Sequence, residues 1–203
     1  MWELFVKGGP IMYLLLLCSV SAVYIIIQKY LFLSVQQLDD DCSIESIQSQ
    51  LLSEGKELTL ETLRKKRKII PRVWAAIIKL SDLNRDDIKD AIKEHAIREM
   101  QKLEKNMSLL TSIITIAPIL GLMGTVLGIM DIFNVISGGH IGKPELLSRG
   151  IAEALITTVT GLGIAIPCIL LHQQLRNKID TLLLSIEQSA YALILFCKSQ
   201  TIQ

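Results

Sequence analysis

The chain contains 203 residues, of which 50% are hydrophobic, 21 are Lys or Arg and 20 are Asp or Glu, for a formal net charge of +1. This balance gives no reason to expect nucleic-acid binding, which a strongly basic surface favours. The mean hydropathy of +0.44 is high for a soluble protein, yet residues 34–107 alone hold 14 basic and 14 acidic residues. The rest of the chain is strongly apolar, which is typical of a membrane protein with one large aqueous loop.

The sequence contains no combination of residues that indicates an enzyme or a metal site. Its three histidines are scattered, no CxxC motif occurs, and no nucleophile lies at a recognisable spacing from a base. We therefore expect no catalytic activity, no metal and no cofactor.

Residues 1–10 are predicted to form a short interfacial helix, because Trp2, Phe5 and Lys7 precede a Gly-Gly-Pro break and suit the depth of lipid headgroups. The next 23 residues, 11–33, are apolar. At ~1.5 Å per residue they match the thickness of a hydrocarbon core, so they are predicted to be the first transmembrane helix. The run is too long for a signal peptide and no clear cleavage site follows, so we expect it to remain in the protein.

Residues 34–107 are predicted to form a helical loop. Ser43 can cap a short helix that ends at Gly55, and a second helix is expected from near Thr59 into the basic run LRKKRK. Pro71 is expected to break or restart that helix. The basic run favours a solvated face near the membrane, with contact to anionic lipid or to nucleic acid as the alternatives.

A longer helix is predicted to begin at Asn84, which can cap it while Asp86 and Asp87 occupy the first turn. Apolar residues then recur at steps of three and four as far as Leu110, with no Gly or Pro between them. The pattern predicts one uninterrupted helix that rises from the aqueous loop into the second transmembrane helix, residues 108–133.

Residues 134–149 are predicted to connect the second transmembrane helix to the third, 150–172, and residues 173–203 to continue the third helix without a break. Two membrane helices that extend into the inner solution need neighbours on more than one face, which favours an oligomer.

The orientation follows from the Lys and Arg residues near the helix ends, which favour the inner side of a membrane. The distribution of Lys and Arg predicts that the N-terminus and residues 134–149 lie outside. It predicts that the loop of residues 34–107 and the C-terminus lie inside. The inner set is Lys29, Lys89, Lys93, Arg98, Lys102, Lys105, Arg176 and Lys178, and the outer set is Lys7, Lys143 and Arg149.

The third transmembrane segment has one small and polar face. The carboxylate on this face, Glu153, would cost about 2.5–3.5 kcal/mol within a span on insertion scales. A hydrated path or a partner helix therefore explains the polar residues of this face better than contact with lipid does. Threonines in membrane helices often bond only their own backbone, so packing is the alternative for each of them. Within an arc of under half the helical wheel lie Glu153, Ala154, Thr157, Thr158, Thr160, Gly161 and Ala165.

The second segment carries a stripe of small residues where another helix backbone can approach closely. The stripe consists of Ala117, Gly121, Gly124 and Gly128, and Gly161 is the matching residue on the third segment. Pro118 and Pro167 each remove one backbone hydrogen bond, so both are predicted to kink their helices.

Two segments, APILGLMGTVLGIMDIF (117–133) and GIAEALITTVTGLGIAIP (150–167), closely resemble the signature segments of the MotA/TolQ/ExbB proton-channel family. The opening GGPIMYLLLLCS is similar to ExbB-type N-termini, while the loop is similar only in length and character. The resemblance implies an all-α integral membrane protein with three transmembrane helices, of which the second and third extend into the cytoplasm. It further implies a helical oligomer, a homopentamer, around a central pore. MotA-type subunits differ in having a fourth span.

The resemblance implies a proton-channel, stator-like subunit of a bacterial inner-membrane motor that couples the proton motive force to energised transport or envelope work. The N-terminus would be periplasmic and the C-terminus cytoplasmic. A single-span ExbD/TolR-type partner would supply a membrane Asp as the proton carrier, with a TonB/TolA-type protein as a further partner. By position, Thr125 and Thr158 match the family's pore-lining threonines, and Glu153 matches its carboxylate at the outer end of the third span.

Departures from the family pattern leave some points open. Thr157 and Thr160 occupy places that are often small or aliphatic, so they would make the lumen more polar or change the coupling ion from proton to sodium. Asp131 stands where a neutral residue is common. An ExbB role is favoured over a TolQ role. The alternative functions are a membrane scaffold without ion conduction and a self-contained transporter, although the chain has neither an internal repeat nor a charge deep in a span.

Overall fold

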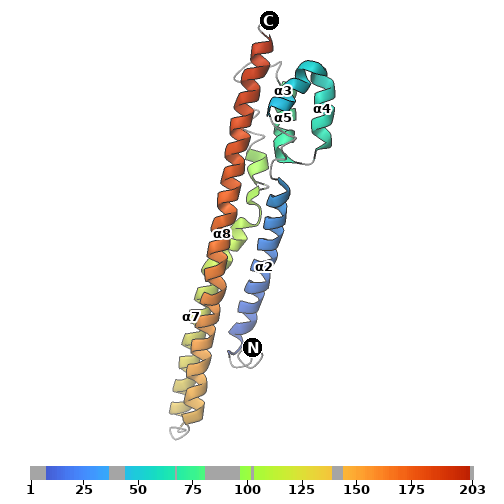
Figure 1. The fold of residues 1–203 in the computed structure, drawn as a ribbon. Helices are drawn as coiled ribbons and strands as arrows, with labels where there is room; N and C mark the ends of the chain where they lie inside the picture. The colour runs from blue at the N-terminus through green and yellow to red at the C-terminus, as the bar shows by residue number, and fades with distance from the viewer. Residues whose placement is uncertain are drawn as a thin grey trace. The chain divides into compact units, whose positions relative to one another are not determined.

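The computed structural model describes residues 8–36, 44–66, 68–80, 97–101, 103–138 and 144–201. Every regular element among these residues is an α-helix (Figure 1). The chain divides into two units, the first made of Met1–Lys29 and Asn106–Leu175 and the second of Tyr30–Lys105 and Arg176–Gln203. Each unit has its own set of buried side chains.

Three of the described helices are long and apolar enough to cross a membrane. They are α2 (Ile11–Gln36), α7 (Met107–Ser137) and α8 (Pro144–Thr201). Since about 20 apolar residues suffice to span a hydrocarbon core, the predicted all-α fold with three membrane-crossing helices is confirmed.

In the first unit, α2 begins immediately after a turn formed by Gly8, Gly9 and Pro10. Two hydrogen bonds hold this turn onto the helix, from the Met12 N–H to the Gly9 carbonyl at 3.2 Å and from the Tyr13 N–H to the Pro10 carbonyl at 3.3 Å. The buried side of α2 joins α7 in one cluster of Ile11, Met12, Leu15 and Ala117, against which Leu120, Ile156 and Ile164 pack. Residues 1–7 of the predicted interfacial helix lie outside the described residues.

The start of α7 differs from the sequence-based expectation. The predicted uninterrupted helix is wrong at residues 105–106, where a turn separates α7 from the helical residues 103–104. Asn106 adopts φ 69°, in the left-handed region, and its side chain donates a hydrogen bond to Gln28 Oε1 of α2 at 3.2 Å. Asn tolerates this conformation better than other residues with a Cβ, so a helix can be interrupted without Gly or Pro. The predicted cap at Asn84 lies outside the described residues.

The predicted continuation of the third span is confirmed, because α8 is one helix of 58 residues that contains Pro167 without breaking at it. The helix starts with Pro144, which suits a first helical position because the first N–H groups have no intrahelical acceptor. Its length far exceeds the ~20 residues that a bilayer requires.

The second unit contains three shorter helices, α3 (Ile44–Ser53), α4 (Gly55–Lys65) and α5 (Ile69–Leu80), of which α4 packs against both α3 and α5. The helix that was predicted to begin near Thr59 corresponds to α4 and begins at Gly55, which has φ 81°. Pro71 lies in the first turn of α5, where a missing N–H costs no helix bond. Ser43, the predicted cap of α3, lies outside the described residues.

The apolar core of the second unit explains why these short helices form. α5 buries Val73, Trp74, Ile77 and Ile78, which are 1–2% exposed, and α4 contributes Leu63, which is fully buried. Helices of this length are marginal in isolation, so burial of their apolar faces supplies most of their stability.

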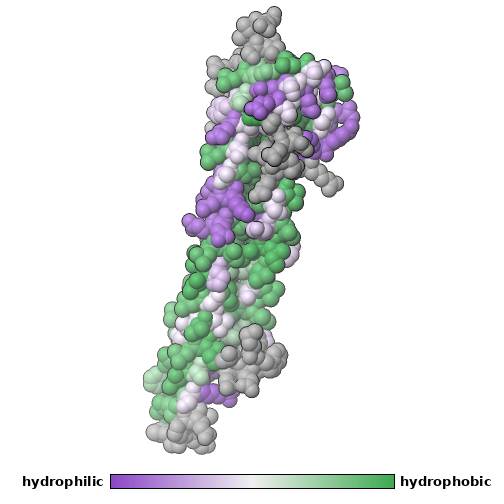
Figure 2. All heavy atoms as spheres, in the orientation of Figure 1, coloured by the Kyte–Doolittle hydropathy of each residue, from purple (hydrophilic) through white to green (hydrophobic). Residues whose placement is uncertain are grey.

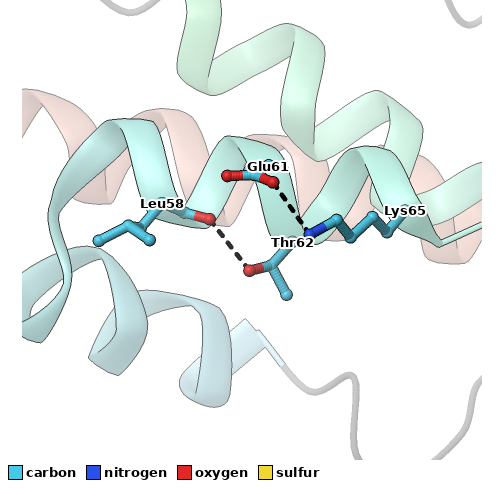
Figure 3. Close-up of polar contacts among 4 residues, drawn as sticks. All are labelled: Leu58, Glu61, Thr62 and Lys65. Atoms are coloured by element: carbon cyan, nitrogen blue, oxygen red, sulfur yellow. Dashed lines mark hydrogen bonds and ion pairs between the residues drawn. The ribbon is translucent and has the colours of Figure 1, made fainter.

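The outer surface of α4 is polar and locally bonded (Figure 3). Lys65 Nζ lies 2.9 Å from Glu61 Oε1, and Thr62 Oγ1 donates to the Leu58 carbonyl at 3.0 Å. The hydrogen bond from Lys65, followed by its positive charge, lowers the pKa of Glu61 below its usual value. Both side chains of the ion pair are largely exposed, so water screens the attraction between them.

Candidate functional site at the contact between α7 and α8

The polar face of α8 and the small-residue stripe of α7 meet inside the first unit. The contacts run in opposite directions along the two helices: Ala117 meets Gly161, Gly124 meets Thr157, and Gly128 meets Gly150. The helices are therefore antiparallel, as expected for two segments joined by a short connection, and they lie side by side in Figure 1.

The two backbones touch at three levels of this contact. A Cβ added to Gly161 would lie 2.6 Å from the Ala117 carbonyl oxygen, one at Gly128 would lie 2.7 Å from the Gly150 carbonyl oxygen, and one at Gly121 would lie 3.0 Å from the Thr157 carbonyl oxygen. Such approaches exclude any side chain, which is the physical reason for glycine here. The structure places all five predicted packing residues in this contact.

Sequence reasoning did not single out Gly150 as a packing residue. A Cβ at Gly150 would lie 2.9 Å from the Gly128 carbonyl oxygen and 2.6 Å from Ile132 Cγ1. The signal that could have found it is the spacing of Gly150 and Ala154, two small residues four apart on α8.

Thr157 fills the space opposite Gly124. Its Oγ1 and Cβ occupy the position where a Gly124 Cβ would stand, and the side chain is fully buried. The hydroxyl donates locally, to the carbonyls of Glu153 at 3.1 Å and Ala154 at 2.9 Å. Within the single chain Thr157 is thus part of the helix contact, and its assignment to a pore lining stays a prediction.

Thr158 links the two helices by a polar contact. Its Oγ1 donates to the Gly121 carbonyl of α7 at 3.1 Å, and in a regular helix the same carbonyl accepts the N–H of Thr125. The Thr125 hydroxyl donates to the Leu122 carbonyl at 2.6 Å. Because a hydroxyl has one proton and two lone pairs, both half-buried threonines keep only acceptor capacity for a further partner.

Thr160 belongs to a more open part of α8. Its hydroxyl donates to the Ile156 carbonyl at 2.7 Å, while Gly163 and Pro167 are exposed, and a Cβ at Gly163 would meet nothing within 4 Å. Pro167 has no N–H, so the Gly163 carbonyl lacks its usual intrahelical donor; Pro118 has the same effect on Ile114 in α7. An unpaired carbonyl is costly in lipid, so this face of α8 suits water or another helix.

The two carboxylates of the site lie toward the ends of the membrane segments. Glu153 is half-buried, and its carboxylate contacts Gly9 of the turn before α2, whereas Asp131 is exposed on α7. Residues 107–130 and 154–171 carry no charge. Among the residues that the structure describes, no group of three His, Cys, Asp or Glu side chains could hold a metal ion.

The surface of the first unit indicates the class of protein. Large apolar side chains are exposed along α2, α7 and α8, including Leu17, Leu122, Phe133 and Val159. Figure 2 shows that hydrophobic residues cover much of the visible face of these helices. Exposure on this scale suits lipid rather than water. The chain is therefore a multi-pass helical membrane protein.

Comparison with known proteins gives the family. Residues 28–188 match the MotA/TolQ/ExbB proton channel family, which covers most of the chain. The chain belongs to this family, and the resemblance found in its two signature segments is confirmed.

Individual relatives agree with this family. A putative biopolymer transport protein ExbB homolog of Methanothermobacter thermautotrophicus is 28% identical over 88% of this chain and 63% of its own length. A putative biopolymer transport protein ExbB-like 1 of Synechocystis sp. is 31% identical over 84% of this chain and 68% of its own length. The Tol-Pal system protein TolQ of Haemophilus influenzae is 36% identical over 42% of this chain and 37% of its own length. The chain thus spans about two thirds of the first two relatives and a smaller part of the third.

Proposed function

We propose that this chain is the proton-channel subunit of an energy-transducing complex in a bacterial inner membrane, and that it has no catalytic activity of its own. It assembles as a homopentamer around a single-span ExbD/TolR-type partner and couples the proton motive force to transport or envelope work, an ExbB-type role with a TonB/TolA-type protein as the recipient. The N-terminus is periplasmic and the C-terminus cytoplasmic, in accord with the distribution of Lys and Arg.

The observation that carries this proposal is the polar line on α8, which consists of Glu153, Thr157, Thr158 and Thr160. Glu153 lies near one end of the line. Farther along, the Thr158 hydroxyl donates to the Gly121 carbonyl and the Thr125 hydroxyl donates to the Leu122 carbonyl, so both oxygens keep acceptor capacity. The uncharged stretches 107–130 and 154–171 contain no Asp, Glu, His, Lys or Arg that could carry a proton through the hydrocarbon core. On this proposal a partner helix brings that group, and the threonine oxygens accept a hydrogen bond from its protonated carboxyl.

The test is partner-dependent proton flux in proteoliposomes that contain the full chain and the single-span partner. Thr158→Val removes the hydroxyl at nearly constant volume, and Glu153→Ala removes the carboxylate. We expect each to reduce the flux to that of vesicles without the partner, while the mass of the purified complex stays unchanged. Thr181→Val is the matched control, because Thr181 is exposed and its hydroxyl donates to the Asn177 carbonyl of its own helix at 2.9 Å. Wild-type flux from both Thr158→Val and Glu153→Ala would contradict the proposal.

Thr157→Val sharpens the assignment within the same assay. This variant keeps the shape that fills the space opposite Gly124 but removes the hydroxyl. A loss of flux with intact assembly would place Thr157 in the proton pathway, whereas wild-type flux would restrict it to the helix contact. Replacing the proton gradient by a sodium gradient tests whether Thr157 and Thr160 change the coupling ion.

A membrane scaffold without conduction is the second candidate. It is favoured by one observation: the hydroxyls of Thr125, Thr157, Thr158 and Thr160 already donate to backbone carbonyls. A scaffold predicts the opposite pattern, in which Thr158→Val breaks the assembly and the wild-type complex never conducts.

A further inference from the structure

The turn before α2 lies directly against the carboxylate of Glu153. Glu153 Oε1 occupies the position where a Cβ of Gly9 would stand, with Glu153 Cδ 2.8 Å and Cγ 3.6 Å from that position. Gly9 also adopts φ 68°, which residues with a Cβ rarely adopt. Two independent features, backbone conformation and space, therefore require glycine beside this carboxylate.

The buried start of α2 anchors the turn. Ile11, Met12 and Leu15 are 4%, 6% and 0% exposed, in the cluster that includes Ala117 of α7. Ile156 of α8 packs against that cluster and would lie 3.4 Å from a Cβ at Gly8. Because Ile156 and Glu153 are three residues apart, they lie on the same side of α8. The backbone that bounds the carboxylate is thus held by packing of the start of α2 against α7 and against Ile156 of α8.

We propose that Gly9 is a positioning residue for Glu153: its bare backbone, held by the buried start of α2, sets where the carboxylate stands at the end of the polar line. This inference rests on the proposed function, in which Glu153 belongs to the proton pathway. A long side chain such as Glu has several rotamers, and contact with an anchored backbone excludes those that point into the turn. A Cβ at residue 9 displaces the carboxylate without removing it.

The first test is a double-mutant cycle in the flux assay, with the full chain and its partner. Gly9→Ala introduces both the Cβ and backbone strain, while Gly9→Asn introduces the Cβ in a residue that tolerates the left-handed conformation. We expect both to lower the flux at least about tenfold, since a misplacement of a reacting group by about 1 Å can cost ~10²-fold. Gly55→Ala is the control for strain alone, because Gly55 has φ 81° and a Cβ there would meet nothing within 4 Å; its flux is expected to equal that of the wild type.

Glu153→Asp completes the cycle, because it shortens the side chain by one methylene and withdraws the carboxylate from the added Cβ. In the Glu153→Asp chain, Gly9→Ala is expected to change the flux less than about twofold. The difference between this change and the loss in the wild-type background is the coupling that residues in contact show. An equal loss in both backgrounds, or wild-type flux from Gly9→Asn, would overturn the positioning role. Wild-type flux from Glu153→Ala would instead overturn the proposed function itself, so the two failures are distinguishable.

A second measurement tests the geometry without flux. In a chain whose native cysteines are replaced by Ser, Gly9→Cys combined with Glu153→Cys should form a disulfide within one subunit on mild oxidation. The Cγ of Glu153, whose place the new sulfur takes, lies 3.6 Å from the position of a Cβ at residue 9, which is close enough for a disulfide to form. Gly9→Cys combined with Gly163→Cys, ten residues farther along α8, should not. Absence of the first disulfide in a folded, assembled chain would overturn the inference.

Discussion

Single atoms decide whether α7 and α8 can touch, and Gly161 is the clearest case. Its hydrogen faces the Ala117 carbonyl, so a Cβ there would lie 2.6 Å from that oxygen. Gly163, two residues along the same helix, points to the other side of α8, where a Cβ would meet nothing within 4 Å. The two glycines share sequence context and differ only in what stands opposite them.

We therefore expect Gly161→Val to lower the free energy of unfolding by about 1–3 kcal/mol or more, the usual cost of overpacking a close contact. The measurement is denaturant unfolding in detergent, followed by the loss of helical circular dichroism. Gly163→Val is the control, because it adds the same β-branched side chain to α8 without a neighbour in the way. Equal destabilisation by the two variants would show that helix propensity, and not the contact, accounts for the effect.

The exposed ion pair on α4 gives a pH-dependent prediction at the same scale. Lys65 lowers the pKa of Glu61 in the folded protein, so the pair stabilises the fold above the unfolded pKa of Glu61. That contribution is lost as the pH falls through the lowered folded pKa. The melting temperatures of the wild type and Glu61→Gln should thus differ slightly at neutral pH and converge in acid. A difference that grows on acidification would contradict the assignment.

At the scale of elements, the start of α7 depends on Asn106. Its left-handed φ of 69° interrupts the helical path between residue 104 and Met107, and its side chain bonds Gln28 of α2. The hydrogen bond lies within the first unit and joins the first two membrane helices. The interruption is therefore held both by a local conformation and by a contact between helices.

Asn106→Ala is expected to destabilise the protein by about 1–2 kcal/mol, because Ala tolerates the left-handed region less well than Asn and cannot replace the bond to Gln28. Asn106→Gly, which loses the same bond but adopts the conformation freely, should cost less. Thermal unfolding of the two variants provides the comparison. If Asn106→Ala were the more stable of the two, a continuous helix through this position would be the better description.

At the scale of the whole molecule, the proposed orientation can be tested by labelling. In a chain without native cysteines, Ser137→Cys at the end of α7 should react with a membrane-impermeant maleimide in cells with a permeable outer membrane. Tyr191→Cys on α8 should react only after the inner membrane is opened. Both positions are exposed in the structure, so whether the maleimide labels them depends on which side of the membrane they lie. The reverse pattern would invert the topology derived from the distribution of Lys and Arg.

Much of the fold could be predicted because the responsible signals are local. The length of an apolar run and its 3.6-residue period decide whether a segment forms a membrane helix, and the structure has α2, α7 and α8 where those runs lie. The small stripe on α7 was visible for the same reason, since its spacing repeats along one helix. The left-handed conformation of Asn106 was not predicted, because the sequence alone does not indicate where an Asn adopts a positive φ.

By itself, the amino-acid sequence determined the helices, the small-residue stripe and the polar face of the third span, since each depends on neighbours three or four residues away on one helix. The tertiary structure decided which groups meet: Thr157 opposite Gly124, the Thr158 hydroxyl on the Gly121 carbonyl, and the Glu153 carboxylate against Gly9. These contacts depend on the distance between two backbones and on the φ angle of single residues. Those quantities arise only when distant segments pack together, and periodicity along one segment does not contain them.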